Sequence, residues 1–188
     1  ARGRKGQFKA RLAALDGQKV DITHADMADK LTKVIDEAYK VTLFEYKYDV
    51  YINAPLIGYL FNHKGTKNNI KDQKDVSIFA EQMIGISDQL KYILRLILLL
   101  DKNYEPDEEK RLDKAFRKLG QDPKDLELFD AYLLGGVEVL YKALVEEPVT
   151  DSVEYINRMY EFVEEFNIRF NSQITNKDIL ALCSGGNR

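Results

Sequence analysis

The chain of 188 residues has no tryptophan, one cysteine, two histidines and four prolines. Cys183 has no second cysteine to pair with, so an internal disulfide is excluded and nothing in the sequence requires an oxidising compartment. We therefore expect an intracellular, cytoplasmic location. Four prolines and eleven glycines are too few for a low-complexity or linker-rich chain.

Long apolar runs are missing as well. The longest, residues 93–100, is interrupted by Arg95 and falls far short of the roughly 20 residues that span a bilayer. The basic start is followed by Phe8 and a short apolar cluster at 12–15, where a signal peptide would have a long apolar region. We expect no membrane span.

Motifs for catalysis or ligand binding are absent too. His24 and His63 have no neighbouring cysteine and form no helical His-x-x-x-His or Glu-x-x-His pair, so we expect a helix cap at His24 and a solvated loop at His63. Gly135 and Gly136 lie inside a helical pattern, which indicates a close helix crossing or a local break. The sequence predicts no catalytic residue, no metal site and no cofactor.

What the sequence does have is a strong charge asymmetry. Residues 1–11 carry five basic side chains and no acid, which leaves 23 basic against 31 acidic residues in the rest of the chain. One end is therefore expected to seek phosphate or acidic surfaces while the remainder repels them. The predicted contact residues are Arg2, Arg4, Lys5, Lys9 and Arg11.

Helical signals begin at Thr23, which with Asp26 resembles a capping box. Apolar residues then recur at helical spacing as far as Val41. This pattern predicts a long first helix that begins near Ala25.

The next segment is ambiguous. Residues 44–50 alternate as a strand does, but they fit a helix nearly as well, and the brief segment 20–22 is the only alternating partner. We therefore favour helix over strand. The run 53–55, Asn-Ala-Pro, predicts a cap or kink before a second short helix at 56–62.

A polar loop at 64–74 precedes the most apolar segment, residues 76–100, which we expect to be the central helix. Proline and acids at 105–109 are typical of a helix start, and Gly120 is placed as a left-handed helix end.

Asp122 and Pro123 repeat the start signal, and the helix they open ends before Pro148. Asp151 opens a further helix that continues towards Phe170, and a last short helix follows Thr175. These patterns predict one all-α bundle of about six or seven helices. We expect the chain to divide into a basic arm with a short lead-in at 1–17, a helical domain at 18–183 and a flexible tail at 184–188.

Aromatic side chains cluster in one part of the chain. Exposed rings are typical of protein interfaces, and acids offset the neighbouring lysines, so the cluster is a poor platform for nucleic-acid bases. The predicted partner interface is Phe44, Tyr46, Tyr48, Tyr51 and Tyr59.

Together these features predict a non-enzymatic helical binding or assembly protein. A face of the bundle would engage a protein partner or a second copy, and the basic arm would engage phosphate or an acidic surface. One alternative is a nucleic-acid accessory protein acting through the arm and neighbouring Lys19, Lys30 and Lys33. Another is a metal-independent enzyme with carboxylates in a helical pocket.

Overall fold

The computed structural model describes residues 22–66, 88–147, 149 and 151–171. Within these ranges the chain is an all-α bundle with one small hairpin, as the sequence predicts. The elements are α2 (His24–Leu31), β1 (Val34–Asp36), β2 (Val41–Thr42), α3 (Lys47–Leu60), α5 (Asp88–Leu100), α6 (Glu108–Phe116), α7 (Pro123–Leu144), α8 (Ser152–Phe166) and the π-helical turn η1 (Asn167–Asn171).

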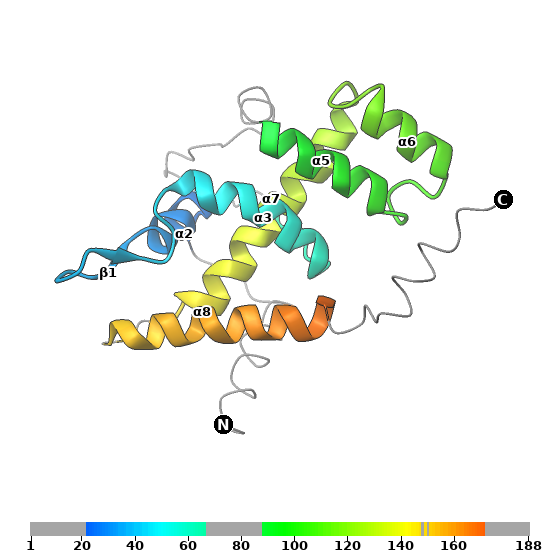
Figure 1. Cartoon of the computed structure of the whole chain (residues 1–188). Coiled ribbons are helices and arrows are strands. Elements are labelled where there is room, and N and C mark those ends of the chain that lie inside the picture. Colours follow the sequence, from blue (N-terminus) through cyan, green and yellow to red (C-terminus); the bar gives the residue numbers. More distant parts are fainter. Residues whose placement is uncertain (1–21, 67–87, 148, 150, 172–188) are drawn as a thin grey trace.

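Helix α7 occupies the middle of the molecule and contacts α2, α3, α5 and α8 (Figure 1). Asp122 caps its start through the backbone N–H of Lys124, and Pro123 takes the first helical position, where no N–H is needed. The prediction that residues 76–100 form the central helix is wrong for the described part. Helix α5 buries one face and leaves Tyr92 and Leu100 exposed, whereas α7 is buried along most of its length.

Helices α3 and α7 cross at very close range, which confirms the close crossing predicted at the glycine pair. A Cβ atom at Gly136 would collide with the carbonyl of Ala54, and one at Gly58 would collide with the carbonyl of Tyr132. Glycine is required at both positions because backbone packs directly on backbone. The predicted cap at 53–55 and the separate helix at 56–62 are wrong, since α3 continues through Pro55 and buries it.

The long first helix predicted from Ala25 is also wrong, because α2 ends at Leu31 and a β-hairpin follows. A carboxylate oxygen of Asp36 accepts the backbone N–H groups of the next turn, and Lys40 adopts a positive φ of 52°. β-branched residues on both strands suit this extended pairing. The helix favoured for 44–50 is confirmed from Lys47 onward, where α3 begins, and is wrong for residues 44–46, which form bends.

The helix starts predicted further along the chain are confirmed. Asp107 caps α6 by accepting the backbone N–H groups of Glu109 and Lys110, and Asp151 caps α8 by accepting that of Val153. Gly120 has a φ of 73° in the turn before α7, while the end of α6 falls at Arg117. The predicted helices at 76–87 and after Thr175 lie outside the described residues.

Candidate functional site

Helix α8 carries a row of apolar side chains that faces solvent. Their spacing of three, four and three residues places them on one side of the helix, and each is between 48 % and 71 % exposed. We call this row the outer face of α8. It consists of Val153, Ile156, Tyr160 and Val163.

The opposite side of α8 attaches the helix to the bundle. Phe162 is buried and stacks on Phe61 at the end of α3, with ring centroids 5.9 Å apart. Arg158 is also buried and donates hydrogen bonds to the carbonyl oxygens of Leu144 and Glu147, at 3.2 and 2.7 Å. The helix is therefore held by its inner side, and its fold does not depend on the outer face.

The sequence predicts a helix from Asp151, but the prediction does not distinguish a buried side of this helix from an exposed one. The structure instead separates exposed Ile156 from buried Phe162. A second apolar row at 153, 156, 160 and 163 was readable from the sequence as a seven-residue repeat. Acids at 154, 161 and 164 follow one edge of this row, so the outer face has an acidic margin.

The predicted aromatic interface does not form a single surface. Tyr51 is buried in the core, and Tyr59 packs edge-on against Tyr132, with the ring centroids 5.6 Å apart. Phe44 is half-buried against the same core. Tyr46 and Tyr48 are exposed, at 62 % and 43 %, and they are the members of the cluster that a partner could reach.

The five predicted anion-contacting residues in 1–11, together with Lys19 and Cys183, lie outside the described residues. Lys30 is inside them, and its Nζ donates to the hydroxyl of Tyr141 at 3.4 Å and lies over the ring of that tyrosine. Lys33 lines a cleft to which Val34 of the hairpin and Val145 at the end of α7 also contribute. The structure thus gives Lys30 an internal contact.

Both histidines of the chain meet at one carboxylate on α7. Nε2 of His24 lies 2.8 Å from Oε1 of Glu138, and Nε2 of His63 lies 2.6 Å from Oε2. An ionised carboxylate only accepts hydrogen bonds, so each imidazole must carry its proton on Nε2 in this contact. The predicted helix cap at His24 is wrong because Thr23 caps α2, and the predicted solvated loop at His63 is wrong because this side chain is mostly buried.

The electrostatics of this cluster favour an ionised Glu138. Burial raises the pKa of the carboxyl. The hydrogen bonds from His24 and His63 together lower it by more than burial raises it, and the resulting pKa is about 2. The cluster connects the start of α2 and the segment after α3 to the central helix. It had no sequence signal, since its members are 75 and 114 residues apart.

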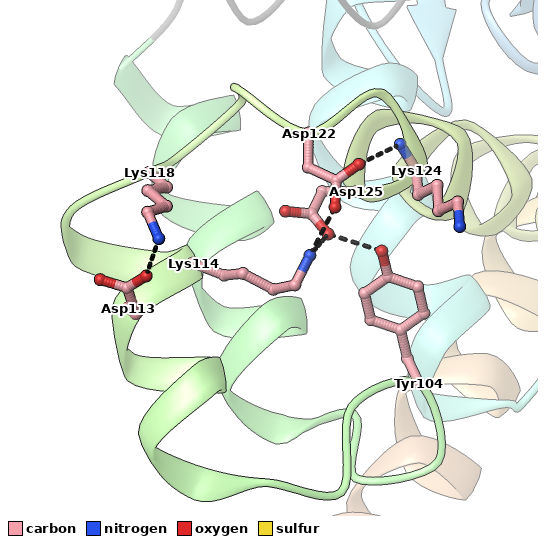
Figure 2. Close-up of polar contacts among 7 residues, drawn as sticks. All are labelled: Tyr104, Asp113, Lys114, Lys118, Asp122, Lys124 and Asp125. Carbon is pink, nitrogen blue, oxygen red and sulfur yellow. Dashed lines mark hydrogen bonds and ion pairs between the residues drawn. The ribbon is translucent and has the colours of Figure 1, made fainter.

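A second buried polar cluster joins α6 to the start of α7 (Figure 2). Nζ of Lys114 donates to Oδ2 of Asp122 at 2.8 Å and to Oδ1 of Asp125 at 2.7 Å. The hydroxyl of Tyr104 donates to the same Oδ1 at 2.6 Å. Burial lowers the pKa of Lys114, but its two carboxylate partners raise it above the ordinary value, so the ammonium stays charged.

Within the described ranges, no group of three or more His, Cys, Asp and Glu side chains is arranged to hold a metal ion. In the same part of the chain, no helix is sufficiently long and apolar to cross a membrane. Comparisons with protein-family models, with curated proteins and with solved structures find no match.

Proposed function

We propose that this chain is a non-enzymatic assembly protein in which the outer face of α8 in one copy binds the basic segment 1–11, with its apolar continuation, of a second copy. The observation that carries the proposal is the exposed apolar row on a helix whose fold does not require it. Contiguous exposed apolar surface with a polar margin is typical of sites where proteins bind one another.

Charge complementarity selects the occupant. Helix α8 carries four glutamates and a single arginine, Arg158, which is buried and forms an ion pair with Glu154 at 3.7 Å, so the helix keeps a net negative charge. Two copies of the outer face packed on each other would bring acidic margins together, which is unfavourable. A basic partner avoids this repulsion, because its positive side chains are attracted by the acidic margin.

The basic segment has the matching composition. It carries five positive side chains and no acid, and Phe8, Leu12 and Leu15 follow at spacings of four and three residues. Such spacing is typical of one apolar side of an amphipathic helix, the kind of peptide that docks into an apolar face. The segment therefore complements the outer face of α8 in both charge and hydrophobicity.

The test is the mass of the particle in solution, measured by light scattering during size-exclusion chromatography. We expect the full chain to self-associate in a concentration-dependent and salt-sensitive manner. We expect monomers from a variant lacking residues 1–11 and from the double variant Ile156→Asp with Tyr160→Asp. The control is Tyr39→Asp, which changes an even more exposed tyrosine in the hairpin and should leave the mass unchanged.

Mixing the two monomeric variants makes the test decisive. The shortened chain retains its outer face and the double variant retains its basic segment, so an equimolar mixture should form a heterodimer. A full-length chain that remains monomeric, or oligomers that survive both changes, would overturn the proposal. If the full chain is monomeric and binds a generic DNA duplex only when residues 1–11 are present, the nucleic-acid alternative replaces it.

A further inference from the structure

The polar cluster of Figure 2 borders a cleft that the proposed assembly does not use. The cleft lies between α6 and the start of α7 and has a volume of about 450 Å³. This volume is in the range of small-molecule sites in proteins. Its lining residues are Lys110, Asp113, Lys114, Lys118, Gln121, Asp122 and Asp125.

Asp125 is the unusual member of this lining because it is completely buried and only half satisfied. Its Oδ1 accepts hydrogen bonds from both Lys114 and Tyr104, while Oδ2 has no hydrogen-bond donor. Figure 2 shows this second oxygen turned away from Tyr104, toward the side of the cleft where Asp113 and Lys118 lie. A buried acceptor without a donor is costly, so a group that donates to Oδ2 would be bound favourably there.

The remaining charges indicate what else such a ligand must carry. Asp113 binds Lys118, and Lys114 is shared by two carboxylates. The lining holds three lysines and three aspartates, so the cleft has no net charge and favours no ion of a single sign. Lys110 and Lys118 offer ammonium groups to an anionic end, while Asp125 requires a cationic or neutral donor at the other.

We propose that this cleft binds a small organic zwitterion of the amino-acid class, with its ammonium group on Oδ2 of Asp125 and its carboxylate between Lys110 and Lys118. Lys118 is 61 % exposed, so its ammonium group can move from Asp113 to the ligand carboxylate. The ion pair of Lys114 with Asp122 and Asp125 holds the floor of the cleft in place before binding. The ligand therefore meets groups that are already positioned, which lowers the ordering cost of binding.

The experiment is isothermal titration calorimetry on the full chain. The probes are L-alanine, β-alanine and 4-aminobutyrate, which separate the two charges by increasing distances, at up to roughly 10 mM so that millimolar affinity is detected. Propylamine and propionate, each with one charge, are the reference probes. We expect saturable binding of at least one zwitterion and none of either reference probe.

Two variants test the assigned contacts. Asp125→Asn keeps an oxygen for Lys114 and Tyr104 but places an amide donor where the ammonium group needs an acceptor, so zwitterion affinity should fall about tenfold or more. Lys118→Gln, at an exposed position that the fold tolerates, should weaken binding by a smaller factor while propylamine remains unbound. Asp88→Asn removes a fully exposed carboxylate on α5 and should change nothing.

Absence of saturable binding with all three zwitterions would overturn the proposal. It would equally be overturned if binding occurs but neither Asp125→Asn nor Lys118→Gln weakens it. Tight binding of propionate or propylamine alone would also contradict it, because the neutral lining would then not be the source of selectivity.

Discussion

The contact of Glu138 with both histidines predicts a measurable dependence of stability on pH. The pKa of this carboxyl falls from an ordinary 4.5 to about 2 in the folded chain. Since one pKa unit corresponds to about 1.4 kcal/mol, ionisation of Glu138 contributes ~3 kcal/mol to the free energy of unfolding. That is a sizeable part of the ~5–15 kcal/mol typical of a domain.

The sign follows from the direction of the shift. A pKa that is lower in the folded than in the unfolded chain gives stability that is fully present above pH 4.5 and is lost as the pH falls toward 2. By pH 3 about 2 kcal/mol of the ~3 kcal/mol should be gone. The variant Glu138→Gln has no carboxyl group at this position, so its stability should not show this loss as the pH falls.

The assay is urea unfolding of the wild type and of Glu138→Gln at pH 5 and at pH 3. The other acids titrate alike in both proteins and cancel in the difference. We expect the stability gap between the two proteins to shrink by about 2 kcal/mol from pH 5 to pH 3.

The matched control is Glu37→Gln, which removes an exposed glutamate whose ion pair with Lys40 lies in the hairpin. The free energy of unfolding of this control variant should stay within ~0.5 kcal/mol of the wild-type value at both pH values, as expected for a surface ion pair. If Glu138→Gln follows the wild type in parallel between pH 5 and pH 3, the two histidine contacts do not hold the carboxyl ionised and the reasoning is refuted.

Three further changes test the packing of the helices, each by thermal or urea unfolding. Gly136→Ala should cost at least about 3 kcal/mol because the new methyl group would collide with the carbonyl of Ala54 in α3, and a neutral result would mean that the helices can separate at little cost. Gly120→Ala should cost only about 1 kcal/mol, from its left-handed backbone alone, since no atom lies within 4 Å of the new methyl group. Asp107→Ala should cost ~1 kcal/mol through loss of the α6 cap, and Asp107→Asn should restore most of it.

The sequence located helix starts well because a cap is a local signal. Thr23, Asp122 and Asp151 each accept a hydrogen bond from a backbone group within three residues, and that spacing is visible in the chain itself. Helix ends were harder to predict. The end of α2 depends on the hairpin that follows, and the continuity of α3 through Pro55 depends on packing against a helix some eighty residues later.

The candidate sites also differ in how far a local sequence pattern predicts them. The row on α8 obeys a periodicity, so it could have been read from the sequence, although deciding which of two apolar rows faces outward required the packing of Phe162 and Arg158. The pairing of His24 and His63 with Glu138 follows no local pattern. Only the docking of α2 and of the segment after α3 on α7 brings these side chains together.

Buried acids explain why α7, and not the more apolar α5, organises the bundle. Glu138 and Asp125 both lie on α7, and each requires donors that other elements supply, from the histidines at one position and from Tyr104 and Lys114 at the other. An apolar face accepts many neighbours, but a buried carboxylate is stable only beside its own donors, so these acids select how the elements dock. Helix α8 is attached differently, by Phe162 and by the hydrogen bonds of Arg158. Changes on α7 should therefore alter stability first, whereas changes on the outer face of α8 can alter binding while the fold is retained.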